Sequence, residues 1–160
     1  MQTSNEMPKQ YLALLTLLLA GAACEAPTAP GEHDSLVAAR ALWRARGSDS
    51  YTFTVNRGCF CVLGGQTVTV TVTSGAVTAA EYESSGAAVD KALLTYVATV
   101  PDLFDLIQSA LDAKPTLFAA TYDPVYGYPT RIEIDYSANV VDDELAISAR
   151  NLTLSGSSAR

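Results

Sequence analysis

Residues 67–73 read Thr-Val-Thr-Val-Thr-Val-Thr, an unbroken alternation of two β-branched residue types. Successive side chains of a strand point to opposite faces of a sheet, so this stretch predicts a strand with a valine face and a threonine face. Gly64-Gly65 precedes the stretch and Ser74-Gly75 follows it, and both dipeptides are typical of tight turns. We therefore expect the middle strand of an antiparallel meander, with its valines buried and its threonines in water.

Five further strands are expected around this one, because short apolar or alternating runs recur between turn residues. They cover residues 51–62, 76–83, 116–122, 130–136 and 145–154. In the last of these the alternation changes phase at Asn151, which predicts a β-bulge.

Two helices are expected as well. The first runs from Asp34 or Ser35, either of which can cap it, to Arg46, and Gly47 closes it in the left-handed conformation. The second begins at Thr99, whose spacing to Asp102 matches a capping box, and ends before a proline.

The order of elements is a helix with three strands, followed by a second helix with three strands. Runs of antiparallel strands punctuated by helices indicate the α+β class. We therefore predict two helix-plus-three-strand units that form a curved antiparallel sheet, with the helices packed on one face.

The N-terminal segment indicates export. The run from Tyr11 to Ala23 is apolar and ends on small residues, and it is shorter than the roughly 20 residues that a membrane span needs. Cys24 follows directly, which resembles the lipobox of bacterial lipoproteins and implies a lipidated thiol. An ordinary secretory signal cut near Ala23, with Cys24 incidental, is the alternative. Translation from Met7 rather than Met1 would make the leader net positive.

These features divide the chain into a signal peptide (residues 1–23), a tether (24–33), one domain (34–154) and a frayed tail (155–160). The expected location is the bacterial cell membrane or outer membrane, where a lipid anchor holds a domain that faces the periplasm or the exterior. The net charge is −7, and the basic residues are scattered. Nucleic-acid binding is therefore disfavoured, because it depends on clustered cations that neutralise phosphates.

Cys59 and Cys61 are the two cysteines that remain if Cys24 is lipidated. If Gly64-Gly65 set the hairpin register, both thiols lie on the buried valine face. Residues two apart in an extended strand are nearly 7 Å apart at Cα, which is the limit for a disulfide, and a bend at Gly58 would close that gap. A disulfide, two buried free thiols and a redox or metal role all remain open.

Tyr122, Tyr126, Tyr128 and Tyr136 concentrate around one expected turn. Tyrosine combines an apolar face with a polar tip and is enriched at binding surfaces, so these residues are a candidate interaction surface. The alternative is that they cover the edge of the core while their hydroxyl groups reach water.

Asp135, Asp142, Asp143 and Glu144 are a weak calcium candidate, because together they offer several carboxylate oxygens. They lack the spacing and the central glycine of an EF-hand loop. The alternative is a solvated turn between two strands.

Several motifs occur in an order that resembles a bacterial domain-of-unknown-function family of small exported and lipid-anchored proteins. They are Cys-Phe-Cys at 59–61, Leu-Phe-Asp-Leu-Ile at 103–107, Tyr-Asp-Pro-Val-Tyr-Gly-Tyr-Pro at 122–129 and Asp-Asp-Glu at 142–144. The resemblance covers roughly residues 36–154 and implies export and a compact domain. It implies no catalytic residues, because the family has no assigned activity.

Catalysis has little support in the sequence. The single histidine, His33, lies in the tether, and no Gly-x-Ser-x-Gly elbow is present. We expect a non-enzymatic extracytoplasmic module without a cofactor, which binds a protein or another component of the envelope. The alternative is a thiol-disulfide or metal-handling protein that uses Cys59 and Cys61.

Overall fold

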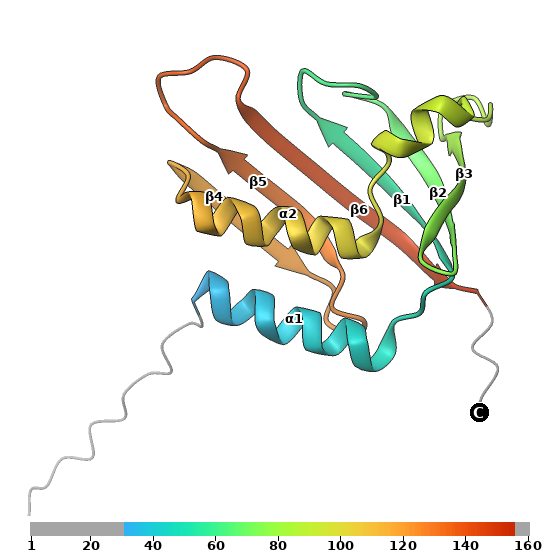
Figure 1. Ribbon diagram of the computed structural model, residues 1–160, viewed down its shortest axis with the longest axis horizontal. Coiled ribbons are helices and arrows are strands. Elements are labelled where there is room, and N and C mark those ends of the chain that lie inside the picture. Colours follow the sequence, from blue (N-terminus) through green and yellow to red (C-terminus); the bar gives the residue numbers. More distant parts are fainter. Residues whose placement is uncertain (1–30, 156–160) are drawn as a thin grey trace, which may run out of the picture.

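The computed structural model describes residues 31–155 (Figure 1). The elements are α1 (Glu32–Arg46), β1 (Tyr51–Gly58), β2 (Thr67–Thr73), β3 (Ala76–Tyr82), the 3₁₀ helix η1 (Lys91–Tyr96), α2 (Val100–Ala113), β4 (Leu117–Tyr122), β5 (Pro129–Asp135) and β6 (Glu144–Leu154). The predicted signal peptide, residues 24–30 of the predicted tether and residues 156–160 of the predicted tail lie outside the described residues. Among those described, no helix has the length and apolar character needed to cross a bilayer.

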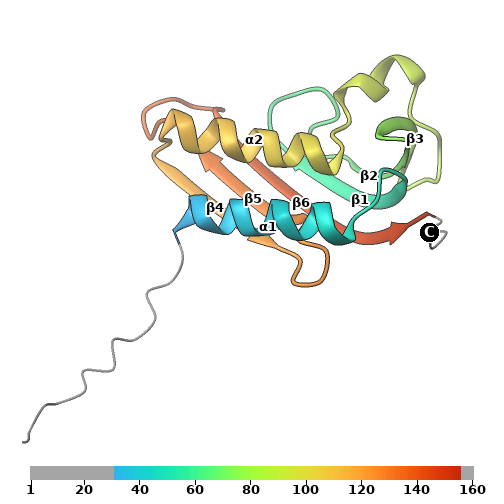
Figure 2. The same ribbon diagram turned by 60° about the horizontal axis from the view of Figure 1, so that its bottom comes forward.

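All six strands form one antiparallel sheet in the order β3-β2-β1-β6-β5-β4. The first and last strands of the chain, β1 and β6, lie side by side at its centre, with Val55 opposite Ala149. Both long helices cover the same face of this sheet (Figure 2). The fold is therefore closed by a pairing between two segments about a hundred residues apart in sequence.

The prediction of two helix-plus-three-strand units was wrong. The sheet is continuous and dominates the fold, and α1 packs on β4 rather than on the strands that follow it in sequence. The helices α1 and α2 pack against each other and against β4, α2 also packs against β5, and the short helix η1 packs on β3. An apolar helix face is buried wherever the assembled sheet offers room, and sequence order does not determine that place.

The valine face of β2 is buried as predicted. Val68, Val70 and Val72 are all less than 5 % exposed, whereas Thr69 and Thr71 between them are partly exposed. From α2, the fully buried side chains of Leu103 and Ile107 pack into the same core. Burial of this continuous apolar layer is the main force that holds the helices on the sheet.

The two helices begin and end differently. The capping box of α2 is confirmed, because Asp102 donates its backbone N–H to Thr99 Oγ1 (3.2 Å) and accepts that of Thr99 at Oδ2 (2.8 Å). The predicted end of α1 at Arg46 is confirmed, but its predicted start and the left-handed conformation of Gly47 were wrong, since the N-cap is Gly31 without a side-chain cap and Gly47 has an extended backbone. Gly47 is instead required for close approach, because a Cβ there would lie 2.6 Å from the ring of Trp43.

Candidate functional site

A cleft of about 550 Å³ opens where the last turns of α1 meet the first turn of α2. The strand β1 starts beneath it, and the turn between β2 and β3 borders it through Gly75. Its lining combines three aromatic rings with two arginines and two aspartates, which are Trp43, Tyr51, Phe104, Arg40, Arg44, Asp49 and Asp105. This size and this mixture of apolar walls with a few polar groups are typical of small-molecule sites.

The floor of the cleft is made of core aromatics. The rings of Trp43 and Tyr51 meet edge to face with their centres 5.3 Å apart, and both side chains are nearly buried. The hydroxyl of Tyr51 accepts the backbone N–H of Val100 at 2.8 Å. Burial raises the pKa of Tyr51 to about 12, so this hydroxyl keeps its proton at neutral pH. The floor is therefore apolar, uncharged and fixed to the first residue of α2.

Arg40 is held in place at one wall. Its Nη2 donates to the backbone carbonyl of Phe104 (2.8 Å) and to Oδ1 of Asp105 (3.0 Å). Its guanidinium carbon also lies 5.5 Å from the centre of the Phe104 ring, a cation–π distance. These contacts join α1 to α2 and leave Arg40 little freedom to follow a ligand.

Arg44 lies one turn further along α1, on the same side of the helix as Arg40. It is exposed, and it makes no hydrogen bond or ion pair within residues 31–155. Asp49, across the cleft, accepts a hydrogen bond from the hydroxyl of Ser50 at 3.1 Å. Arg44 is thus the cationic group of the cleft that is best placed to meet an anionic ligand.

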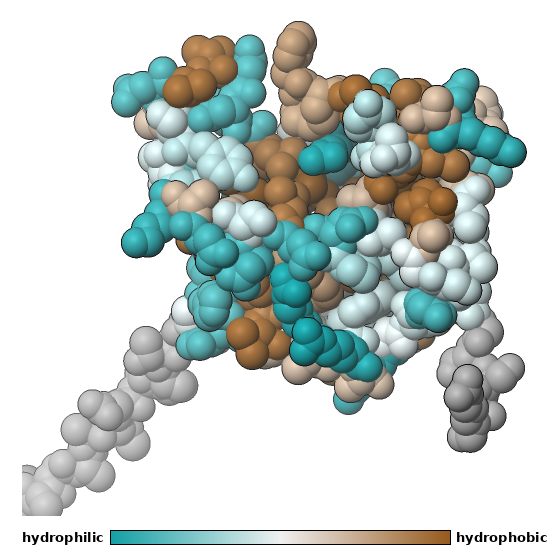
Figure 3. Space-filling view, viewed as in Figure 1, coloured by the Kyte–Doolittle hydropathy of each residue, from teal (hydrophilic) through white to brown (hydrophobic). Residues whose placement is uncertain are grey.

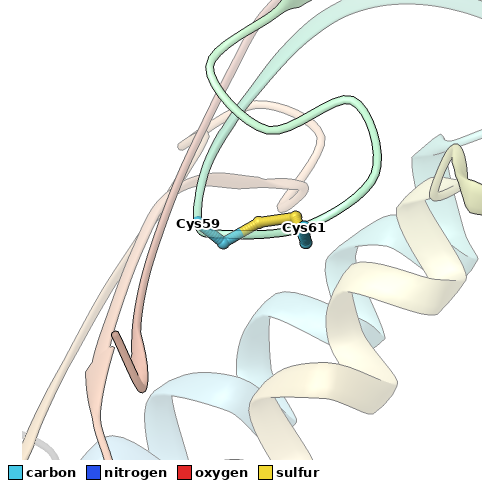
Figure 4. The surroundings of a disulfide bond; sticks show 2 residues. All are labelled: Cys59 and Cys61. Carbon is cyan, nitrogen blue, oxygen red and sulfur yellow. A yellow bond between two sulfur atoms is a disulfide. The ribbon is translucent and has the colours of Figure 1, made fainter. Parts of the chain in front are cut away.

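Cys59 and Cys61 form a disulfide, with their Cα atoms 5.3 Å apart (Figure 4). The predicted register was wrong, because β1 ends at Gly58 and Val55 rather than Cys61 faces Val68. The chain bends after β1, so both cysteines lie in the connection to β2, and Cys61 is exposed. The prediction treated Gly64-Gly65 as the whole turn, whereas the connection between β1 and β2 spans residues 59–66.

Residues 35–154 match DUF6174, a family of unknown function. The chain belongs to this family. No curated protein and no solved structure shows significant similarity to it. The resemblance to a domain of unknown function, predicted over nearly the same residues, is confirmed at that level, and no activity follows from it.

The DUF6174 domain does not gather the four predicted tyrosines on one surface. Tyr128 is buried in the core, and Tyr126 is packed against its edge. The ring of Tyr122 stacks on Phe104 with 6.4 Å between centres, and burial raises its pKa to about 12. Tyr136 is 41 % exposed and follows the far end of β5, at the opposite end of the sheet. At least three of the four therefore serve packing.

The predicted acidic residues form part of a hairpin. Asp135 lies opposite Glu144 in the β5–β6 pairing, and its carboxylate accepts the backbone N–H of Ser137 at 3.0 Å. Asp142 has a positive φ of 69° in the connection between these strands. Among the residues that the structure describes, no three His, Cys, Asp or Glu side chains come together in a group that could hold a metal ion. His33, placed in the tether by sequence, lies exposed in the first turn of α1.

A smaller hollow lies beside the first two turns of α2, between them, the end of η1 and the strands β1 and β6. Its volume is about 330 Å³, and its lining is mixed, with apolar side chains that include Tyr96, Leu103, Leu106 and Ile147. Apolar side chains are visible in the hollowed region between α2 and the loops at the top of Figure 3, whereas the outward faces of the long helices are largely hydrophilic. Arg57 also borders this hollow.

Sequence reasoning missed the cleft. From sequence, the first helix was considered only for where it begins and ends. The spacing of Arg40, Trp43 and Arg44 does put a tryptophan between two cations on one side of the helix. That pattern is the signal that could have indicated a site, although the partner residues on α2 and β1 are not visible from it.

Proposed function

We propose that this protein is an exported, lipid-anchored binding module that holds a small amphipathic anion in the cleft between α1 and α2. The observation that carries the proposal is the cleft itself, with its buried aromatic floor and, at its rim, the cation of Arg44, which has no partner within residues 31–155. An aromatic or aliphatic body would pack on Trp43 and Phe104. A carboxylate, sulfonate or phosphate group would accept charged hydrogen bonds from the guanidinium of Arg44.

Binding rather than catalysis is supported by the groups that the cleft offers. The titratable hydroxyl of the cleft belongs to Tyr51. Its pKa is raised to about 12, and it accepts a hydrogen bond from the backbone N–H of Val100. The one histidine of the chain, His33, lies at the opposite end of α1 from the cleft. A proton-transfer step at neutral pH usually needs a group that titrates near that pH.

The only tryptophan of the chain lies in the cleft, so its fluorescence reports binding there. The probe is 8-anilinonaphthalene-1-sulfonate, an aromatic anion that accepts energy from tryptophan. We expect Arg44→Glu to weaken its binding at least tenfold. Lys91→Glu is the matched control, because Lys91 is exposed in η1 and does not line the cleft. Equal affinity in both variants, with unchanged melting temperatures, would refute the cleft as the site.

The anchor rests on the lipobox-like segment around Cys24. Several acyl chains on one cysteine would give stable attachment, whereas a single chain gives only marginal binding. Radiolabelled palmitate should enter the wild-type chain and not Cys24→Ala when both are produced in a bacterial host. Equal labelling of the two would refute lipidation at this residue. Export without any labelling of the wild type would instead favour an ordinary secretory signal.

A second candidate function is thiol-disulfide exchange by Cys59 and Cys61, which the exposure of Cys61 favours. In that reaction the disulfide accepts two electrons from a partner dithiol, which becomes a disulfide while both cysteines become thiols. Mass spectrometry after incubation with a reduced and oxidised glutathione pair measures the exchange. Ready exchange supports this role, and resistance to mild thiols indicates a structural bridge. Titration of the reduced protein with Zn²⁺ tests whether Cys59 and Cys61 bind a metal ion instead.

A further inference from the structure

The sheet ends in two edge strands, β3 and β4. An edge strand presents a row of unpaired N–H and C=O groups that can pair with another strand. Proteins that avoid such pairing cover the edge, charge it or distort it. The two edges of this sheet differ in that respect.

The edge at β3 is protected. Residues 87–89 fold back over it, so that Tyr82 donates its N–H to the carbonyl of Ala87 (2.9 Å) and Val89 donates to that of Ala80 (2.8 Å). Glu81 adds a charge to the strand and pairs with Ala88 in an isolated bridge. The pairing of β2 with β3 is also irregular between Thr71 and Val72.

Among the residues that the structure describes, the edge at β4 is neither covered by a hydrogen-bonded segment nor charged, and its pairing with β5 shifts only at the end of the strand, between Thr121 and Tyr122. Its sequence, Leu-Phe-Ala-Ala-Thr-Tyr, contains no charged residue, no proline and no glycine. Its pairing with β5 is regular from Leu117 to Thr121. In the described part of the chain, no backbone hydrogen bond joins β4 to any segment other than β5. A neutral segment of six residues with high β-propensity is the kind that adds a further strand readily.

The tether of the same chain is unsuited to cover this edge. Residues 24–30 include Pro27 and Pro30, which carry no N–H and disrupt a hydrogen-bonded ladder. A strand from outside the chain is therefore the better partner.

The composition of β4 favours a second copy of the same strand. Residues directly opposite in an antiparallel pair share a face, so a two-fold axis at Ala120 places Phe118 of each copy against Tyr122 of the other. Two such aromatic pairs flank a centre formed by two small alanines. The net charge of −7 makes copies repel each other in general, but β4 brings no charged side chain to this contact.

We propose that two copies of this protein associate through antiparallel pairing of their β4 strands, which joins the two sheets into one. This pairing does not depend on the proposed ligand, because no residue of β4 lines the cleft. The lining comes from the two helices, β1, the segment before it and the β2–β3 turn. Both clefts stay open in the pair.

Cysteine cross-linking of the full chain tests this arrangement. Opposite residues of an antiparallel pair lie about 4.5 or 5.5 Å apart at Cα, within the range of about 4.4–6.8 Å that a disulfide accepts. We expect Ala120→Cys to give a cross-linked dimer under mild oxidation, at least tenfold above the wild type, whose native cysteines set the background. Ala79→Cys is the matched control, because Ala79 is exposed on the protected edge strand β3.

Two further variants keep the test decisive. Ala119→Cys covers a two-fold axis one residue earlier, and a dimer there also supports pairing of β4 with itself. Thr121→Lys in the Ala120→Cys background places a charge in each copy at the contact and should reduce the dimer at least fivefold without changing the melting temperature. The proposal is overturned if neither 119 nor 120 cross-links above Ala79→Cys, or if the cross-linked product contains a different protein.

Discussion

Tyr51 is the side chain that couples the sheet to both helices, and Tyr51→Phe tests this coupling. Its ring contacts Trp43 of α1 and lies 5.7 Å from the ring of Phe53. Its hydroxyl accepts the N–H of Val100, one of the helix N-terminal donors that have no partner within the helix. Phenylalanine keeps the ring contacts and opens no large cavity, so the variant removes little besides this acceptor.

The expected cost follows from the burial of the donor. Tyr51 is 1 % exposed and Val100 is fully buried, so water cannot replace the lost hydroxyl. Leaving a buried donor unsatisfied costs about 1–3 kcal/mol. We therefore expect the free energy of unfolding, measured by urea denaturation at pH 7, to fall by about that amount with an unchanged m-value.

Alkaline pH supplies an internal check. The pKa of Tyr51 is raised from 10.0 to about 12, chiefly by burial. Below pH 10 both states hold the proton, but between pH 10 and 12 the unfolded state ionises first, so the wild type loses stability as the pH rises. At 1.36 kcal/mol per unit the upper limit of this loss is about 3 kcal/mol. Tyr51→Phe lacks this titration, so the difference between the two proteins should shrink towards pH 12.

Two outcomes would refute this account of Tyr51. One is a difference in unfolding free energy below about 0.5 kcal/mol at pH 7, since a typical net hydrogen bond exceeds that. The other is a difference that stays constant from pH 8 to pH 12. Tyr136→Phe is the control, because Tyr136 is exposed, and we expect its stability at pH 7 to equal that of the wild type.

Three other substitutions, together with one control variant, test separate features by the same denaturation assay. Thr99→Ala removes the capping box of α2 and should cost about 0.5–2 kcal/mol. Gly127→Ala combines a φ of +79° with a Cβ 2.4 Å from the carbonyl oxygen of Ala39 and should cost about 2–4 kcal/mol. Gly86→Ala, with a φ of +68° and open space around it, is its control and should cost about 1–2 kcal/mol. Ile107→Ala empties a fully buried site and should cost about 2–5 kcal/mol, and a loss below 1 kcal/mol would contradict its place in the core.

The features that sequence predicted well are those that local chemistry determines. The strand β2 has the predicted bounds because alternation over residues 67–73 needs no distant partner to be recognised. The capping box at Thr99 is equally local. The bulge at Asn151 was also predicted, and the register of β1 with β6 shifts opposite it, where Asn151 has a φ of 58°.

The features that sequence did not predict depend on contacts between distant segments. The pairing of β1 with β6 and the position of α1 over β4 both follow from how the whole apolar surface is buried. The cysteine loop was misjudged because one turn signal, Gly64-Gly65, was assumed to set the register by itself. The cleft was missed for the same reason, since Trp43, Tyr51 and Phe104 meet only after three elements have packed.

Because the floor of the cleft is part of the core, ligand binding and folding should be linked. Trp43, Tyr51 and Phe104 are each less than 10 % exposed, and the cleft exists only while α1, α2 and β1 hold them together. A ligand that binds this arrangement and not the unfolded chain stabilises the protein by about 2.7 kcal/mol at a hundred times its dissociation constant. Thermal shift measured against a panel of amphipathic anions therefore identifies the ligand class directly. A true cleft ligand raises the melting temperature of the wild type and of Lys91→Glu but not that of Arg44→Glu, whereas a compound that shifts all three equally binds elsewhere.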